Sequence, residues 1–151
     1  MARDWTDLIC SNIPLARAMQ IGTELVDDGR VRLTAPLAPN VNDKGTGFGG
    51  SVATLATVAG WIEVQRQLAA ADIDTSVEIV IQRGETRYLV PVTSDFSALV
   101  EPVDEASVDR FVRMFQKRGM ARLSLSAEVL CQGLSCASFQ GEYVVTRASA
   151  S

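Results

Sequence analysis

Histidine is absent from this chain of 151 residues, and its absence removes several kinds of functional site. Without histidine the chain can form neither a Ser-His-Asp triad nor a zinc site of the usual histidine–cysteine type. Long apolar runs are also missing. The longest, residues 52–64, is interrupted by threonines, a glycine and Glu63, and it is shorter than the ~20 residues of a membrane span. We therefore expect no membrane segment and no metal centre.

Cysteine is scarce, and the odd count of three argues against a disulfide framework. Cys10 has no histidine to activate it. Cys131 and Cys136 flank a predicted tight turn, in which Cys131 would oppose Leu134. Cys136 would then oppose Val129, which makes the two sulfur atoms diagonal neighbours. We interpret these residues as two buried, unreactive thiols rather than as a redox pair.

The charge balance is acidic, with a formal net charge of −4, which argues against nucleic acid as the main partner. Asp4 and Asp7 stand where a signal peptide would need a basic and then an apolar region, so we expect a cytoplasmic protein. Residues 110–122 carry basic side chains and no acidic one. They form either a solvated basic surface or a docking site for an anion, such as a pantetheine phosphate, a nucleotide or an acidic carrier protein. The basic residues are Arg110, Arg113, Lys117, Arg118 and Arg122.

No internal repeat, low-complexity tract or linker interrupts the chain, and we expect a single domain over residues 1–151. The Asp28-Gly29 pair predicts a hairpin turn between two strands. Residues 108–117 fit either a short helix or an irregular crossover. The other predicted elements are helix 13–20, strands 21–27 and 30–36, helix 51–71, strands 77–82, 86–92 and 96–100, and the hairpin pair 122–132 and 134–146.

The predicted helix 51–71 has little polar face over its first three turns, so it must be covered on all sides. The remaining segments are mostly strands, which can supply that cover. An antiparallel sheet wrapped around one long central helix, the α+β hot-dog fold, satisfies this order of elements. The exposed edge of such a sheet is satisfied by pairing across a two-fold axis. We therefore expect a homodimer, with a dimer of dimers left open.

The segment NVNDKGTGFGGS, residues 40–51, leads directly into that helix. Its glycines let the backbone approach a ligand closely, and Ser51 is expected to cap the helix. The first helical turn presents unpaired N–H groups and the positive end of the helix dipole. Such a site suits an anion, or a carbonyl oxygen that gains negative charge during a reaction.

The pattern Asn-x-x-Gly-x-x-aromatic-Gly-Gly resembles the loop of hot-dog thioesterases, where histidine usually holds the aromatic position. The chain resembles the YiiD C-terminal-like hot-dog family more closely. The resemblance implies an acyl thioester of acyl carrier protein or coenzyme A as substrate and no further cofactor. Members of that family are described as thioesterases, and some are malonyl-acyl-carrier-protein decarboxylases that supply an acetyl primer for fatty acid synthesis. The matching stretches are APLAPNVN (35–42), GTGFGGS (45–51), GW (60–61), RYLVPVTS (87–94) and CQGLSCASFQGEYV (131–144).

The residues favour decarboxylation over hydrolysis. Hot-dog hydrolases of the histidine-Gly-Gly type usually place a carboxylate two and a half turns into the helix, where this chain has Thr57. Asp43, Glu85 or an acid from a partner subunit remain alternative bases for a thioesterase. Decarboxylation needs only a stabilised enolate oxygen and an oriented carboxylate. A non-catalytic acyl-thioester binder is the third reading.

Asn42 is the predicted orienting group, because a neutral amide can hold a carboxylate without overstabilising its charge. Its alternative role is to hydrogen-bond its own loop. The amides of Gly49, Gly50 and Ser51 are predicted to stabilise the enolate oxygen. Tyr88 is expected at the pocket or at the dimer interface, and Arg87 at the pantetheine phosphate or on a free surface. The predicted substrate-binding residues are Asn40, Thr46, Phe48, Thr57, Arg87 and Tyr88.

Overall fold

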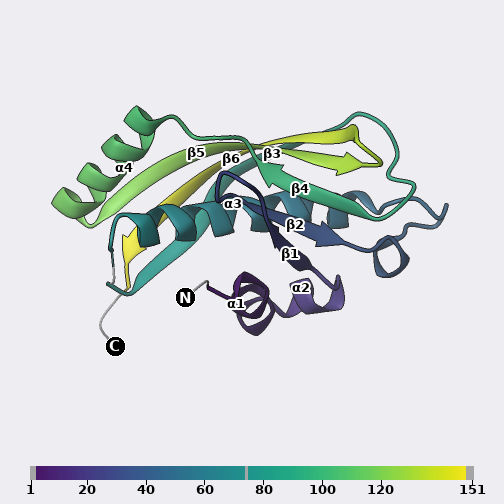
Figure 1. Cartoon of the computed structure of the whole chain (residues 1–151), viewed down its shortest axis with the longest axis horizontal. Helices are drawn as coiled ribbons and strands as arrows, with labels where there is room; N and C mark the ends of the chain where they lie inside the picture. The colour runs from purple at the N-terminus through teal and green to yellow at the C-terminus, as the bar shows by residue number, and fades with distance from the viewer. Residues whose placement is uncertain (1–2, 74, 149–151) are drawn as a thin grey trace.

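The computed structural model describes residues 3–73 and 75–148. One long helix, α3 (Gly49–Ala70), lies against one face of a six-stranded antiparallel sheet (Figure 1). This is the α+β hot-dog arrangement that the sequence predicts. The sheet has the order β1-β2-β4-β5-β6-β3, with the strands β1 (Gly22–Leu25), β2 (Val31–Ala35), β3 (Val77–Tyr88), β4 (Phe96–Val100), β5 (Met120–Cys131) and β6 (Leu134–Arg147).

The central helix is buried because the apolar side chains around its circumference are covered by the sheet and by the N-terminal helices. Gly60 permits the closest approach. A methyl group at this position would overlap the hydroxyl group of Tyr143, which donates a 2.6 Å hydrogen bond to the carbonyl oxygen of Thr57. Glu63 is the buried charge of this helix, and Arg66 and Gln67 donate hydrogen bonds to it. A hydrogen bond therefore holds the helix to β6, and the buried carboxylate of Glu63 is paired with side chains of the same helix.

Strands β5 and β6 form a long hairpin whose side chains alternate between the core and the solvent. Cys131 pairs with Leu134, as predicted. The prediction that Cys136 opposes Val129 is wrong, because the register shifts at a β-bulge and Val129 pairs with Ala137 instead. Cys136 is therefore the extra residue of the bulge.

The N-terminal segment differs from the single predicted helix 13–20. It contains α1 (Trp5–Asn12), capped by the Asp4 side chain, and α2 (Pro14–Ala18), which begins at the predicted proline. The crossover left open in the sequence is a helix, α4 (Glu105–Arg118), with Asp104 as its N-cap and Gly119 in the left-handed conformation as its C-cap. A short 3-10 helix, η1 (Ala38–Asn40), precedes the glycine-rich loop.

Strand β3 is continuous over 12 residues, and the prediction of separate strands 77–82 and 86–92 is wrong. It pairs with β6 on both sides of an irregularity between Ile81 and Arg83. This irregularity interrupts the alternation of apolar residues, and for that reason the sequence suggests two strands. On its other side β3 is the edge of the sheet. Within residues 3–73 and 75–148, no helix is both long enough and apolar enough to cross a membrane.

Candidate active site

The loop before α3 is tied down at several points. The amide of Phe48 donates to the carbonyl oxygen of Asn40 at 2.7 Å, and the amide of Gly47 donates to the carbonyl oxygen of Val92 at 2.8 Å. Gly47 must be a glycine, because a Cβ atom there would lie 2.8 Å from the Cβ atom of Val92. The loop is thus fastened both to the chain before it and to the segment that follows β3.

Helix α3 begins at Gly49, two residues earlier than predicted, and its N-cap is Phe48. Ser51 lies within the first turn, so the prediction that it caps the helix is wrong. No side chain caps this end. The amides of Gly49, Gly50 and Ser51 have no acceptor within the helix, because helix geometry leaves the first turn unpaired. This uncapped end is able to receive negative charge from outside the helix.

A cavity of about 360 Å³ opens at this end of α3. One wall is the loop, and the opposite wall is the irregular segment that follows β3. The part of the chain that the structure describes supplies no carboxylate to this lining, and its titratable groups are the phenol of Tyr88 and the thiol of Cys136. The lining residues are Asn42, Thr46, Gly47, Gly49, Val52, Tyr88, Leu89, Val90, Pro91, Val92 and Cys136.

Asn42 lines the cavity and also holds the loop. Its Oδ1 accepts hydrogen bonds from the amides of Lys44 at 2.8 Å and Thr46 at 3.1 Å. Its Nδ2 donates to the Oγ1 of Thr46 at 2.8 Å. The loop-bracing role is therefore present, and the same side chain faces the cavity beside the end of α3.

Tyr88, the last residue of β3, joins the two walls. Its hydroxyl group donates a 2.8 Å hydrogen bond to the carbonyl oxygen of Gly49, and its ring lies 3.5 Å from the position of a Cβ atom on that glycine. More than half of the Tyr88 side chain is exposed, as is that of Phe48. The ring of Phe48 lies over Gly50 rather than in the cavity. Two aromatic rings thus flank the start of α3 and remain uncovered in the protomer.

Other predicted residues lie away from the cavity. Asn40 is buried and braces the loop by donating to the carbonyl oxygens of Met19 and Pro36, while its Oδ1 has no partner. Thr57 bonds the carbonyl oxygen of Ala53 within its own helix. The structure therefore brings together Asn42, Thr46, Gly49 and Tyr88, and leaves Asn40, Phe48, Gly50, Ser51, Thr57 and Arg87 outside the lining.

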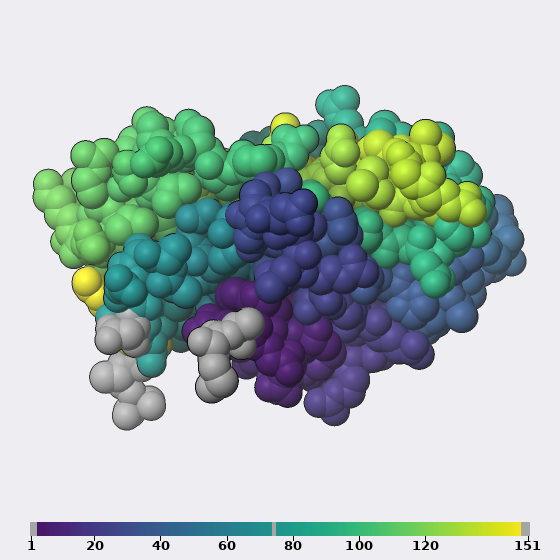
Figure 2. Space-filling view, viewed as in Figure 1, coloured from purple at the N-terminus to yellow at the C-terminus, as the bar shows by residue number. Residues whose placement is uncertain are grey.

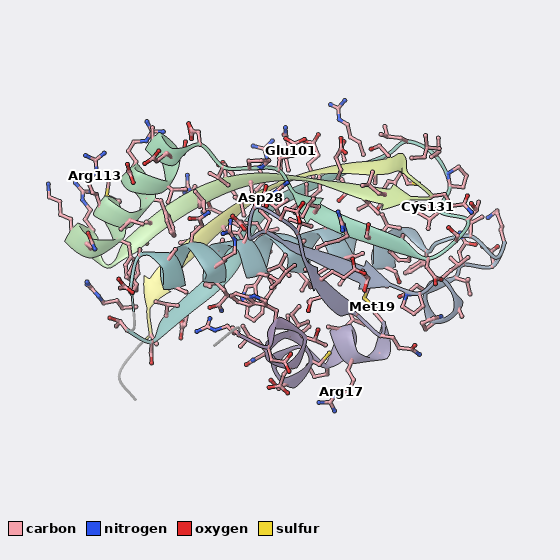
Figure 3. The ribbon with its side chains drawn as sticks, viewed as in Figure 1. Arg17, Met19, Asp28, Glu101, Arg113 and Cys131 are labelled. Atoms are coloured by element: carbon pink, nitrogen blue, oxygen red, sulfur yellow. The ribbon has the colours of Figure 1, made fainter. Side chains whose placement is uncertain are left out.

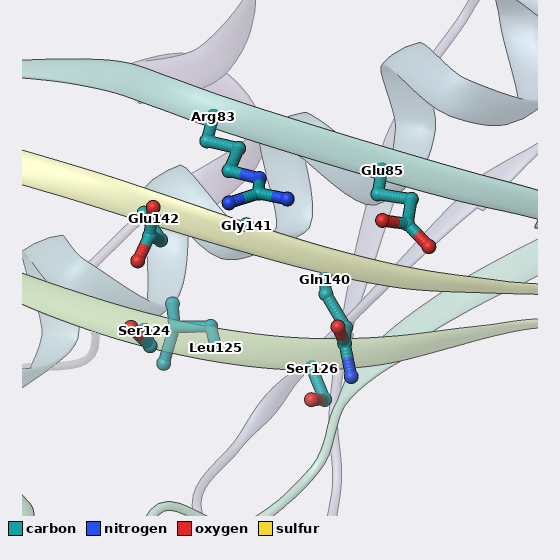
Figure 4. A pocket seen from close by; sticks show the side chains of 8 residues that line it. All are labelled: Arg83, Glu85, Ser124, Leu125, Ser126, Gln140, Gly141 and Glu142. Atoms are coloured by element: carbon teal, nitrogen blue, oxygen red, sulfur yellow. The ribbon is translucent and has the colours of Figure 1, made fainter.

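The two carboxylates considered as bases face elsewhere. Asp43 is highly exposed and pairs with Lys44. Glu85 lies on the outer face of the sheet, where it pairs with Arg87. Figure 4 shows Glu85 projecting into a polar groove that β3, β5 and β6 form on that face. Neither carboxylate belongs to the lining of the cavity at the start of α3.

The basic residues of α4 lie at the opposite end of the molecule from the loop. Figure 2 shows α4 as a green lobe at one end and the blue loop residues at the other. The 22 residues of α3 separate the two ends by about 33 Å. Arg110, Arg113, Lys117 and Arg118 therefore cannot contact a ligand in the cavity of their own chain.

Sequence reasoning missed the segment Leu89–Val92 and Cys136 as parts of the lining. The pairing of β3 with β6 ends at Tyr88, and Pro91 indicates that the segment after it is irregular, because proline cannot donate a backbone hydrogen bond. Nothing local marks Cys136, because its position depends on the bulge. Within the described residues, no three metal-ligating side chains come together.

Known proteins resemble this chain along almost its whole length. The model of the YiiD C-terminal family, described as "Putative thioesterase", matches residues 3–147. A crystal structure of a protein from Shewanella oneidensis, also described as a "putative thioesterase", is 34% identical to this chain. The match covers 94% of each chain, with a TM-score of 0.82. A protein of unknown function from Chlorobaculum tepidum is 28% identical over 95% of this chain and 93% of its own, with a TM-score of 0.88.

More distant structures support the fold alone. A Bacillus halodurans protein crystallised with CoA is 21% identical, covers 97% of this chain and 91% of its own, and has a TM-score of 0.69. No curated protein sequence matches the chain significantly.

Proposed function

The chain belongs to the YiiD C-terminal family of the hot-dog thioesterase superfamily, and on that basis we propose that it decarboxylates a malonyl thioester of acyl carrier protein or coenzyme A. The product would be the acetyl thioester, a primer for fatty acid synthesis. The observation that carries the proposal is a cavity beside an uncapped helix N-terminus with no carboxylate in its described lining.

Decarboxylation suits this lining because it requires no strong base. When the carbon–carbon bond to the carboxylate breaks, the electron pair passes to the thioester oxygen as an enolate. The amides at the start of α3 can stabilise that negative charge, and one such donor typically contributes about 3 kcal/mol. The enolate carbon then takes a proton from water. The thioester bond to sulfur stays intact throughout.

Asn42 is the group we assign to the malonyl carboxylate. Its Nδ2 uses one hydrogen on Thr46; the nitrogen lies 3.5 Å from the carbonyl oxygen of Gly47, a long contact that uses the second hydrogen only weakly. That hydrogen can orient a carboxylate at the cavity wall without neutralising it. A cation at this position would stabilise the substrate more than the transition state.

A homodimer is part of the proposal, because β3 is a long edge strand with exposed apolar side chains. Val80 is 58% exposed, and Tyr88 and Leu89 are 57% and 56% exposed. Pairing the β3 strands of two copies would cover these groups and complete the sheet. Replacing Val80 by lysine should shift the protein from dimer to monomer in light scattering, while a Glu128→Gln control, at an exposed position on the inner strand β5, should not.

The same two-fold pairing would bring the basic end of α4 to the site. The C-terminal end of β3 would meet the partner's Val77, beside the partner's Arg147, whose amide contacts the C-cap of α4. Three strand spacings of about 4.8 Å would place the partner's Gly119, which directly follows Lys117 and Arg118, about 14 Å from Tyr88. A pantetheine arm spans a distance of that order, so these residues would hold its phosphate or an acidic carrier protein.

The second candidate function is thioester hydrolysis, which the description of the family favours. Its base would have to come from the partner, and the same pairing places the partner's Glu78 near the C-terminal end of β3. In that case a Glu78→Gln variant would lose the release of free thiol from acyl-CoA substrates. Decarboxylation does not depend on Glu78.

Mass spectrometry of a carrier protein distinguishes the two reactions. After incubation of malonyl-carrier protein with the enzyme, decarboxylation leaves the carrier lighter by one carbon dioxide and still acylated. Hydrolysis returns the carrier with its free thiol. The proposal is wrong if the free-thiol form is the initial product, and a non-catalytic binder would leave the malonyl form unchanged.

A further inference from the structure

Two buried cysteines lie near the turn end of the β5–β6 hairpin. Cys131 closes β5, and Figure 3 places it at that end of the sheet. Both side chains are buried, and both contact the backbone of the segment that follows β3: the sulfur of Cys131 lies 3.8 Å from the carbonyl oxygen of Ser94, and that of Cys136 lies 3.9 Å from the carbonyl oxygen of Pro91. The sequence favours two unreactive thiols that are merely diagonal neighbours. The bulge leaves them diagonal but frees Cys136 from regular pairing, because it stands between Ser135 and Ala137, which pair with Leu130 and Val129.

The pair is joined to the wall of the candidate active site. Cys136 lines the cavity, and its carbonyl oxygen accepts hydrogen bonds from the amides of Leu89 at 2.8 Å and Val90 at 3.3 Å. These two bonds hold the segment that follows β3 against the hairpin. Any movement of the backbone at Cys136 therefore moves the wall opposite the loop.

The two thiols have different environments, and the difference assigns their roles. Burial raises the pKa of Cys131, but hydrogen bonds from Ser94 and Thr93 outweigh it, so the pKa of this thiol is lowered. The Oγ of Ser94 lies 3.1 Å from its sulfur atom. Burial, and then the neighbouring Cys131, raise the pKa of Cys136. Cys131 thus has the larger thiolate fraction and is assigned to react first, and Cys136 to react second.

We propose that Cys131 and Cys136 form a reversible disulfide when the protein meets hydrogen peroxide, and that this bond rearranges the wall of the candidate active site. The Cys131 thiolate attacks one peroxide oxygen; an S–O bond forms, the O–O bond breaks, and hydroxide leaves and takes a proton to become water. The sulfur of Cys136 then attacks the sulfenic acid; the S–S bond forms, the S–O bond breaks, and the oxygen leaves as a second water. Two thiols are oxidised and one peroxide is reduced.

The disulfide must disturb the backbone, because diagonal cross-strand neighbours lie farther apart than the Cα atoms of an unstrained disulfide. The bulged residue has the greater freedom to move, since no residue opposes it. Its displacement toward β5 would weaken the bonds to Leu89 and Val90. A strained disulfide of this kind is also readily reduced, as a reversible modification requires.

Alkylation after oxidation tests the bond itself and requires no substrate. After treatment with hydrogen peroxide, unfolding and alkylation, the protein should carry one alkyl group, on Cys10, and a peptide that links Cys131 to Cys136. Dithiothreitol should restore all three alkylation sites. A Cys10→Ser variant should behave as the wild type does. Alkylation of all three thiols after oxidation, or a link only between chains, would overturn the proposal.

A second variant keeps the test decisive. The Cys136→Ser protein should stop at the sulfenic acid of Cys131, which dimedone traps, because the thiol that reacts second is gone. Trapping at Cys10 alone would contradict the assignment of the nucleophile.

Hydrogen exchange tests the coupling to the cavity wall. In the oxidised protein the amides of Leu89 and Val90 should exchange about five- to tenfold faster, as expected when one hydrogen bond is weakened. The Cys131→Ser protein should show no such change on addition of peroxide. A disulfide that leaves both exchange rates unchanged would refute the effect on the wall. None of these measurements depends on which thioester reaction the protein catalyses.

Discussion

Replacing Asn42 by aspartate separates the two roles of this side chain. The retained Oδ1 can still accept from the amides of Lys44 and Thr46, so the loop keeps these two bonds. The other carboxylate oxygen replaces Nδ2 and can accept a hydrogen bond from the hydroxyl group of Thr46. The substitution therefore adds one negative charge at the cavity wall with little change in the loop.

The size of the effect follows from the charge alone. A malonyl carboxylate held about 5 Å from the new carboxylate is repelled by about 1 to 3 kcal/mol for an effective dielectric constant between 80 and 20. That range corresponds to a fall of about 5- to 160-fold in kcat/KM for malonyl-CoA. Acetyl-CoA lacks the carboxylate, so its Kd should remain within about twofold.

Steady-state rates with malonyl-CoA and calorimetric titration with acetyl-CoA measure the two effects. Asp43→Asn is the matched control, because it changes the charge of the next residue, whose side chain is exposed to solvent and lies outside the cavity lining. It should leave both values unchanged. An Asn42→Asp enzyme that retains its full rate with malonyl-CoA would refute the assignment. An equal loss for both ligands would show that the loop is disrupted.

Three further predictions concern packing, pH and docking. Gly60→Ala forces a methyl group against Tyr143 and should lower the free energy of unfolding by about 1 to 3 kcal/mol in urea titrations. Burial raises the pKa of Tyr143, so its contribution to stability is complete below pH ~10, where the unfolded chain is protonated too, and falls as pH rises further. Tyr143→Phe should lower the stability near pH 7 by about 1 kcal/mol but remove that part of the alkaline decline. Reversing the charges of Lys117 and Arg118 together should raise the KM for malonyl-carrier protein several-fold at low salt, with little effect on a short malonyl thioester that lacks the phosphate.

The local parts of this fold could be predicted from the sequence. The turn Asp28-Gly29, the buried central helix and the long C-terminal hairpin depend on turn residues and on patterns of apolar residues, which are visible in a single chain. The position of the glycine-rich loop at the start of the helix follows from the same local order.

The parts that could not be predicted depend on contacts between distant segments. Strand β3 is continuous because β6 pairs with it on both sides of the irregularity near Gln82. The place of Cys136 depends on a one-residue bulge, which shifts every later residue relative to β5. Helix α1 depends on a side-chain cap from Asp4, and the apolar content of the following residues alone does not indicate where it begins.

The candidate site divides in the same way. The sequence indicates the end of the helix where backbone amides are free, because glycines at the start of a buried helix leave those amides accessible. It does not indicate which polar side chains are already engaged. Thr57 donates a hydrogen bond within its own helix, and Asn42 accepts one within the loop. These hydrogen bonds are known only when the donors and acceptors are placed in space.

The central claim is that the site removes carbon dioxide and keeps the thioester intact. The most direct measurement quantifies carbon dioxide and free thiol together when the enzyme acts on malonyl-CoA, with acetyl-CoA and longer acyl-CoA substrates alongside. We predict one carbon dioxide for each malonyl group consumed, an equal yield of acetyl thioester, and no thiol release from any substrate. Free thiol formed in step with malonyl consumption, without carbon dioxide, would contradict the account.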